Sequence, residues 1–346
     1  MEANFNGNVS VAIVMCTYNR PDLLRDSLQS LVVQQTDGKF SYEVVIVYSG
    51  EVGPTLAVVR DIANHSAVEV RAIHEPRRGQ VVARNRAIEE ANGEWLAHFD
   101  DDQIADPCWL KELMATAREK DSRVVGGALY LKFPHGCQPE LSWQCRRMLG
   151  ESVHWGEVRP YTRKEGPGTG SLLVHRSVFE KVGRFDESFT LRGYDTDFYR
   201  RVREAGIHAW FTRYAVAYHV TPHSRLEDEY FRETSLHNGW HFARRDLLEF
   251  GQVKTVALLV ARLGQATVLH VPRWLIARLS GSKSAILTAR VRLWRTQGYT
   301  RSALHWLAPR FFSQRRFFSK YEFRADQTGR APSNSPANSV TNGSRS

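Results

Sequence analysis

Short apolar runs alternate with amphipathic stretches along the first hundred residues. Four runs rich in β-branched and aromatic residues have the length of buried strands: 9–15, 42–47, 68–73 and 95–99. Between them lie stretches of helical length in which apolar residues recur every three or four positions: 21–33, 54–63 and 80–91. This alternation predicts an α/β fold with a Rossmann-like, doubly wound and mostly parallel sheet.

Polar residues directly follow three of these strands. The segments are Cys16–Arg20, Tyr48–Glu51 and Asp100–Asp102. In doubly wound sheets a ligand binds beyond the carboxyl ends of the strands. We therefore expect the three segments to converge on one site.

The pattern becomes irregular from residue 134. Residues 134–170 are rich in glycine, proline and tryptophan and predict an irregular loop, which could contact a substrate. A short strand at 171–174 and helices at 177–182 and 195–205 follow, and from about residue 226 the pattern is helical.

Charge divides the chain in two. The net charge is +10, yet residues 251–330 hold 15 Lys and Arg against 2 Asp and Glu. We therefore predict an N-terminal tail (1–8), an α/β domain (9–245), a basic helical segment (246–330) and a disordered polar tail (331–346). The four cysteines form no C-x-x-C pair and the first residues show no signal peptide, which together predict a cytoplasmic protein with free thiols.

Three consecutive aspartates, Asp100–Asp102, end the fourth predicted strand. Like charges this close are unfavourable without compensation, and Mg²⁺ or Mn²⁺ shared with substrate phosphates is the usual compensation. Such an ion neutralises the charge of a departing diphosphate. The alternative is a solvated acidic turn, or a helix N-cap at Asp106 followed by Pro107, although such a cap does not explain the triplet.

A second acidic cluster, Asp195 and Asp197, follows Gly193 at a predicted helix start. A carboxylate in this position could be a general base that removes the proton of an attacking hydroxyl, and a single carboxylate opposite the leaving group gives inversion. Helix capping by the same acids is the competing interpretation.

Three further side chains are candidates for the site. Arg84 precedes the triplet on a predicted helix, where it can pair with a phosphate or with Asp100. His219 and His223 are candidate metal or phosphate ligands, although a lone histidine is more often structural.

Taken together, these motifs resemble glycosyltransferase family 2, of the GT-A fold group. The resemblance rests on strand–CTYNRP, on G-x-x-x-ARN-x-A-I-x-x-A-x-GE from Gly79 to Glu94, on F-DDD, and on G-x-DTDF-x-x-R from Gly193 to Arg200. The stretch Y-H-V-T-P-H-S-R-L is similar to the bacterial branch of the succinoglycan glucosyltransferases. The Gln-x-x-Arg-Trp motif of processive synthases is absent, so the resemblance implies the addition of a single sugar.

The resemblance implies a role for each matching residue. It implies Asp195 as the general base and Asp102 as the metal ligand. The donor side, with a UDP-sugar favoured, is implied to include these residues: Thr17 and Tyr18 at the base, Arg20, Arg84 near the nucleotide, and Asp100 and Asp101 at the ribose or a metal-bound water.

Two positions depart from the family pattern. An acidic pair that usually follows the second strand is absent; there, Tyr48 can stack on a base and Glu51 can accept its N–H. Tyr194 stands where the family usually has a glutamate before the base. A non-catalytic protein that binds nucleotide sugars or a membrane is therefore the alternative to an active enzyme.

The basic segment combines arginines with tryptophan and phenylalanine. Its longest apolar stretch, 256–279, is interrupted by polar residues, so we expect it not to span a membrane. Basic amphipathic helices bind anionic membrane surfaces, which predicts a peripheral enzyme on the inner face of the cell membrane acting on a lipid-linked or surface-polysaccharide precursor. A helical subdomain packed on the α/β domain is the alternative, and nucleic-acid binding is not expected because no recognition motif accompanies the charge.

Overall fold

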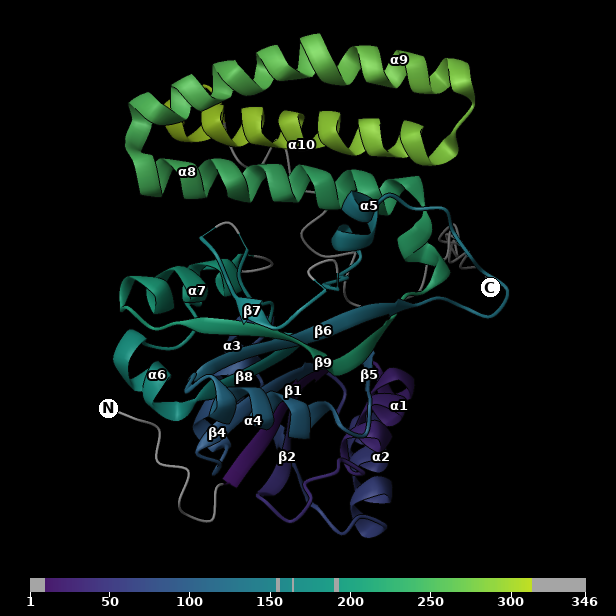
Figure 1. The fold of residues 1–346 in the computed structure, drawn as a ribbon, viewed down its shortest axis with the longest axis vertical. Helices are drawn as coiled ribbons and strands as arrows, with labels where there is room; N and C mark the ends of the chain where they lie inside the picture. The colour runs from purple at the N-terminus through teal and green to yellow at the C-terminus, as the bar shows by residue number, and fades with distance from the viewer. Residues whose placement is uncertain (1–9, 154–155, 164, 190–192, 313–346) are drawn as a thin grey trace, which may run out of the picture.

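The chain was analysed as a computed structural model (Figure 1), and the part that it describes comprises residues 10–153, 156–163, 165–189 and 193–312. The predicted tails, 1–8 and 331–346, lie outside these ranges. An α/β domain forms the lower part of the molecule in Figure 1, and a layer of helices from the C-terminal third lies above it.

A nine-stranded sheet forms the centre of the α/β domain, in the order β3-β2-β1-β4-β8-β6-β9-β5, with β7 beside β9. The strands are β1 (Ser10–Tyr18), β2 (Ser41–Ser49), β3 (Glu69–His74), β4 (Trp95–Asp100), β5 (Gln103–Ala105), β6 (Val124–Lys132), β7 (Arg159–Pro160), β8 (Ser171–His175) and β9 (Ala209–Val220). The helices are α1 (Pro21–Leu31), α2 (Val52–Asn64), α3 (Gln80–Glu90), α4 (Trp109–Glu119), α5 (Trp143–Met148), α6 (Arg176–Val182), α7 (Tyr194–Glu204), α8 (Asp228–Gln265), α9 (Val271–Ser280) and α10 (Lys283–Leu307), with the short turns η1 (His223–Leu226) and η2 (Ala266–His270).

The four N-terminal strands are parallel, as their alternation with helices predicts. The sheet as a whole is mixed, because β8 runs antiparallel to β4 and β6, and β5 and β7 run antiparallel to β9. The α/β class is confirmed. The antiparallel strands come from the segment after residue 100, where the apolar runs are too short to show their direction.

Alternate residues of the central strands enter two separate cores. On β1, Ile13 and Met15 pack with α1, α2 and α4, whereas Ala12 and Val14 pack with α3, α6 and α7. Because side chains of a strand point alternately to opposite faces, both faces of the sheet are covered by helices. The carboxyl ends of β1, β2 and β4 are thus left as the open edge.

Two local predictions differ from the structure. Asp106 does not cap a helix that starts at Pro107; its carboxylate accepts a hydrogen bond from Cys108 N (2.9 Å), and α4 begins at Trp109. The segment 134–170 is not wholly irregular, since it contains α5 and β7. Helix α5 begins after Ser142, whose hydroxyl accepts from the backbone N–H three residues later, a standard N-cap contact.

The C-terminal helices fold back on themselves (Figure 1). Helix α8 begins at Asp228, and the proposed domain boundary at 245/246 falls inside it. The chain reverses at Gly251 (φ 75°) and again at Gly281 (φ 69°), so the helical stretch 252–280 and α10 return alongside the first half of α8. Glycines allow the closest approach, because a Cβ on Gly239 would lie 2.1 Å from the carbonyl oxygen of Arg295.

The prediction that residues 256–279 are too polar to span a membrane is wrong by composition. The helical stretch Asp228–Ser280 contains a window long and apolar enough to cross a membrane, and only 22% of that window is buried. The interrupting polar residues are few, and Arg262 is the one charged residue between Thr255 and Pro272. Composition alone does not decide whether such a helix crosses a bilayer or lies along its surface.

Candidate active site

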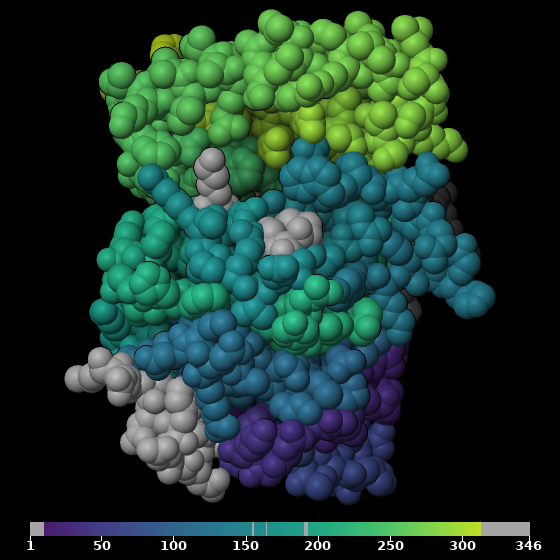
Figure 2. Space-filling model, viewed as in Figure 1, coloured from purple at the N-terminus to yellow at the C-terminus, as the bar shows by residue number. Residues whose placement is uncertain are grey.

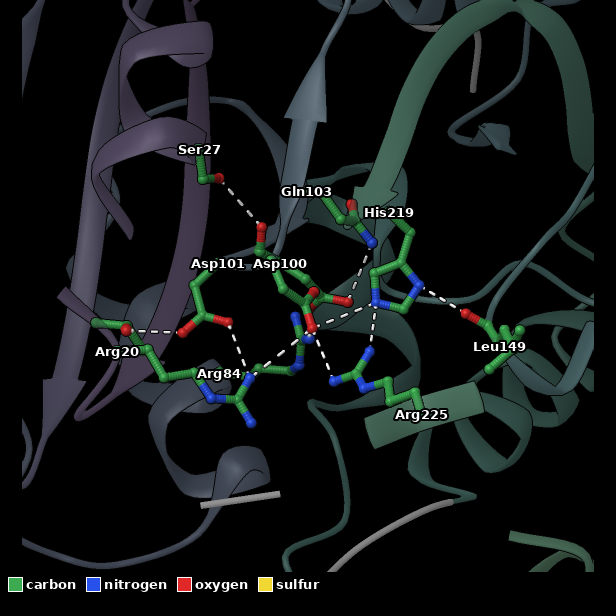
Figure 3. A network of polar contacts seen from close by, with 11 residues as sticks. Arg20, Ser27, Arg84, Asp100, Asp101, Gln103, Leu149, His219 and Arg225 are labelled. Atoms are coloured by element: carbon green, nitrogen blue, oxygen red, sulfur yellow. Dashed lines mark hydrogen bonds and ion pairs between the residues drawn. The ribbon is translucent and has the colours of Figure 1, made fainter. Parts of the chain in front are cut away.

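The three aspartates at the end of β4 differ in their main partners, and Figure 3 labels two of them, Asp100 and Asp101. Asp100 ends β4, and Asp101 and Asp102 form the turn into β5. Asp102 is held beside β9, because its carbonyl oxygen accepts from Val220 N (2.8 Å). The three carboxylates therefore have different main partners, although Arg20 lies near both Asp101 and Asp102.

Asp100 is linked to the second acidic segment through a buried arginine. Arg84 is 1% exposed on α3; its Nη2 donates to Asp100, and its Nε donates to the Tyr194 hydroxyl at 3.1 Å. Thr169 Oγ1 lies 3.1 Å from the same hydroxyl. Burial raises the pKa of Tyr194 to about 12, so the phenol is neutral and supports Arg84 without competing for its charge.

A glycine-rich loop before β8, residues 166–170, lies close to Asp100 and Asp195. A Cβ on Gly170 would lie 2.3 Å from Gln103 Nε2 and 3.0 Å from Asp100 Oδ2, and one on Gly168 would lie 4.0 Å from Asp195 Oδ2. A side chain at Gly170 would therefore force the amide end of Gln103 to move. The sequence offered a signal for this loop, since three glycines occur within 166–170, but nothing in the pattern indicated its target.

Asp101 is buried against the first predicted binding segment. Thr17 Oγ1 donates to its Oδ2 at 2.7 Å, and Arg20 Nη1 lies 3.5 Å from its Oδ1. Burial, and then the adjacent charge of Asp102, raise the pKa of Asp101 to about 6. Thr17 and Arg20 are thus brought to the triplet, whereas Tyr18 is half-buried at the end of β1.

Asp102 faces His219 and Arg225. Its Oδ2 lies 2.9 Å from Arg225 Nη2 and 3.3 Å from His219 Nε2, and Arg20 Nη1 is 3.8 Å away. Burial opposes ionisation, but the positive charges of Arg225 and Arg20 favour the carboxylate and hold the pKa of Asp102 well below its usual range. The pairing of β5 with β9 places His219 opposite Gln103 and so next to Asp102.

The donor set around Asp102 fits a divalent cation. A carboxylate oxygen and an imidazole nitrogen, two common metal ligands, both contact the guanidinium of Arg225, which occupies the position of a cation between them. His223 is exposed on η1. Within the described ranges no three His, Cys, Asp or Glu residues gather as a metal site.

Asp195 and Asp197 differ in what they contact. Asp195 Oδ1 accepts from Thr196 N (2.7 Å) in the first turn of α7, which follows Gly193 at φ 93°. Asp197 instead binds Arg200 at 2.8 Å and Arg201 at 2.9 Å. The carboxylate of Asp197 is thus held by arginines of its own helix.

The segment after β2 is fixed by contact with the segment after β1. Asn19 Oδ1 accepts from Glu51 N (2.7 Å), and a Cβ on Gly50 would lie 2.3 Å from the same oxygen. Glu51 is exposed, whereas Tyr48 is buried with its ring centroid 5.1 Å from that of His74. Tyr48 is only 4% exposed, so its ring presents little free surface for a nucleotide base to stack on.

Three comparisons place these observations among known proteins. Residues 12–182 match the model of Glycosyl transferase family 2. The glycosyltransferase AglE of Haloferax volcanii is 25% identical over 64% of this chain and 71% of its own, and the succinoglycan biosynthesis protein ExoM of Rhizobium meliloti is 25% identical over 64% and 70%. The solved mannosyltransferase PcManGT from Pyrobaculum calidifontis, in complex with GDP-Man and Mn²⁺, has a similar fold (TM-score 0.59, 16% identity, 86% of this chain and 88% of that one).

Proposed function

Because residues 12–182 are a domain of glycosyl transferase family 2, with the GT-A fold, we propose that this glycosyltransferase moves a single sugar with inversion from a nucleotide sugar to an acceptor hydroxyl. One observation carries the proposal: Arg84 and Tyr194 join the aspartates after β4 to the start of α7. Donor-side and acceptor-side carboxylates thereby border one site.

Asp195 is the proposed base. It removes the proton of the acceptor hydroxyl, whose oxygen attacks the anomeric carbon while the bond to the diphosphate breaks. A single displacement gives inversion, and the other two carboxylates of α7 are both engaged by arginines of the same helix: Asp197 by Arg200 and Arg201, and Glu204 by Arg200.

Asp102 and His219 are the proposed ligands of Mg²⁺ or Mn²⁺. When bound, the ion neutralises charge on the departing diphosphate. The imidazole nitrogen favours Mn²⁺, because Mg²⁺ prefers oxygen ligands. The presence of Mn²⁺ in the PcManGT complex agrees with this choice, and its donor, GDP-Man, makes GDP-sugars a second class to test beside the favoured UDP-sugars.

We expect nucleoside diphosphate release from one class of nucleotide sugar, at a rate that requires Mn²⁺ or Mg²⁺. The measurement is coupled detection of UDP and GDP over a panel of sugar nucleotides, with and without a chelator. Thermal unfolding with the same panel reports binding independently, because a ligand of the native state raises the melting temperature. Binding without turnover on any donor or acceptor would favour the non-catalytic alternative.

The proposed acceptor is a lipid-linked or surface-polysaccharide precursor. ExoM is named for succinoglycan biosynthesis, a polysaccharide pathway, which supports this class. An acceptor of this kind lies at a membrane, so the enzyme benefits from a surface that keeps it there. We propose that the protein is peripheral on the cytoplasmic face of the cell membrane.

The helical stretch 252–280 provides such a surface. It forms the outermost layer of the molecule, farthest from the sheet (Figures 1 and 2). Its buried residues face α8 and α10, whereas its outer side is apolar and exposed. We call this the apolar outer face, and it comprises Val253, Val256, Val260, Leu263, Val268, Leu269, Val271, Leu275, Ile276 and Leu279.

Charge around the apolar outer face suits an anionic membrane. Lys254, Arg273 and Arg278 are exposed at its two ends, while Arg262 is drawn inward to Asp246 (3.4 Å). Since one side of the helix is packed on the bundle, we propose that its outer side lies along the lipid interface over about 40 Å.

Replacing Val260 and Val268 together with glutamate is expected to abolish binding to vesicles of phosphatidylglycerol at low salt. Both side chains are exposed (64% and 71%), so folding is not expected to suffer. Flotation measures the bound fraction, and Val33→Glu on the opposite side of the molecule is the matched control, with an exposed fraction of 60%. If the wild-type protein does not bind the vesicles, the membrane proposal fails. It also fails if the double substitution only converts a dimer to a monomer, because the apolar outer face then binds a second copy of the chain.

A further inference from the structure

Arg225 bridges the two proposed metal ligands. It lies on η1, the short turn between β9 and α8, and its side chain is 16% exposed. Its Nη1 lies 2.7 Å from His219 Nε2, and its Nη2 donates to Asp102 Oδ2 at 2.9 Å. One guanidinium therefore contacts both atoms that would hold a cation, as Figure 3 shows for Arg225 and His219.

The contacts of His219 determine which of its nitrogens carries the proton. Its Nδ1 lies 2.6 Å from the carbonyl oxygen of Leu149, which can only accept, so Nδ1 donates. A guanidinium can only donate, so Nε2 accepts from Arg225. Gly150 keeps this arrangement tight, since a Cβ there would lie 2.8 Å from His219 Nδ1.

Two acceptor atoms then lie side by side without a proton between them. Asp102 Oδ2 and His219 Nε2 are 3.3 Å apart, and both direct lone pairs at Arg225. A divalent cation needs the same two lone pairs. The guanidinium and the metal ion cannot use them together, so metal binding requires Arg225 to leave.

The diphosphate of a donor is negatively charged, as Asp102 is, so it can replace Asp102 as the partner of Arg225. Guanidinium groups bind phosphate oxygens through parallel hydrogen bonds, and a donor's diphosphate lies next to the cation that it helps to bind. The turn that carries Arg225 is short, and its neighbours His223 and Ser224 are exposed, so the side chain can change partner without disturbing a core.

We propose that Arg225 is an exchangeable counter-ion: it neutralises Asp102 and occupies His219 in the ligand-free protein, and it transfers to the diphosphate of the donor when a metal ion takes its place. This inference rests on the proposed function. Its consequence is that Arg225 opposes binding of the metal alone and favours binding of metal and nucleotide together, which is a positive coupling between the two ligands.

The variant Arg225→Gln separates these effects. Without nucleotide, we expect its affinity for Mn²⁺, measured from the electron paramagnetic resonance signal of the free ion, to rise about tenfold. With saturating Mn²⁺, we expect its affinity for UDP or GDP, measured by calorimetry, to fall about tenfold. Arg225→Lys keeps the charge but loses the paired hydrogen bonds, so it should weaken nucleotide binding while still opposing Mn²⁺.

Arg232→Gln is the matched control, because it removes the same charge from an exposed position on α8. Thermal unfolding of each variant checks that the chain is folded. If Arg225→Gln lowers the affinity for Mn²⁺ as well as for nucleotide, Arg225 supports the site instead of competing with the ion, and the inference is overturned. If Mn²⁺ alters nucleotide binding in neither the wild type nor any variant, the metal dependence itself fails and the inference fails with it.

Discussion

Asp195→Asn is expected to reduce sugar transfer by about 10²–10⁴-fold, the usual contribution of a positioned base. The amide cannot take the proton of the acceptor hydroxyl. Donor affinity should stay near that of the wild type, because Asp195 lies at the start of α7 and the proposed donor contacts come from β1, α3 and the turn after β4. Steady-state transfer and calorimetry with the donor's nucleotide measure the two quantities separately.

Asp197→Asn should give the opposite result. The carboxylate holds Arg200 and Arg201, and Arg201 in turn donates to the carbonyl oxygens of Val182 and Gly183, so Asp197 ties α7 to the end of α6. We expect a loss of about 1–3 kcal/mol in the free energy of unfolding, with turnover largely retained. A folded but inactive Asp197→Asn beside a fully active Asp195→Asn would reverse the two roles.

Asp102→Asn is expected to remove the dependence of nucleotide binding on Mn²⁺. In the wild type we expect Mn²⁺ to strengthen nucleoside diphosphate binding by about 5–150-fold, the usual range of coupling between two ligands. The amide of the variant has no negative charge to offset the ion, so the gain should vanish. Calorimetric titration of UDP and GDP with and without Mn²⁺ gives the ratio directly.

The matched control for this substitution is Asp106→Asn. Asp106 lies four residues along the chain, and its Oδ1 accepts from Cys108 N, a hydrogen bond that an asparagine oxygen also makes. Asp102→Asn also leaves Arg225 and Arg20 with less compensation, so the free energy of unfolding must be measured beside the affinity. A variant that retains the full Mn²⁺ effect would exclude Asp102 as the ligand.

Local patterns predicted much of the fold. The four parallel strands, the helices between them and the ends at which polar segments converge follow from the spacing of apolar residues in a few consecutive positions. The antiparallel strands β5, β7 and β8 were not predicted as such. Their pairing is with β4, β6 and β9, and a strand of two to five residues carries no signal of its direction.

The candidate site was predicted as a list of residue types rather than as an arrangement. Motif spacing named Arg84, Asp102, Asp195 and His219, but it assigned Arg84 to either a phosphate or Asp100. Only the family resemblance, and not the spacing, preferred Asp195 to Asp197 as the base. Arg225 was present in the motif after β9 and received no role. Its importance appears only in its contacts, because its partner Asp102 is 123 residues away.

The sequence by itself determined the alternation of strands and helices, the acidic end of β4, the acidic first turn of α7, and the basic character of the last third of the chain. These properties depend on neighbouring residues and on composition. The tertiary structure alone decided that Tyr194 supports Arg84 and that Arg225 faces Asp102. It alone decided that the chain turns at Gly251 and places residues 252–280 on the outside. Each depends on where the sheet and the helices bring together residues far apart in the chain, and local periodicity carries no information about that packing.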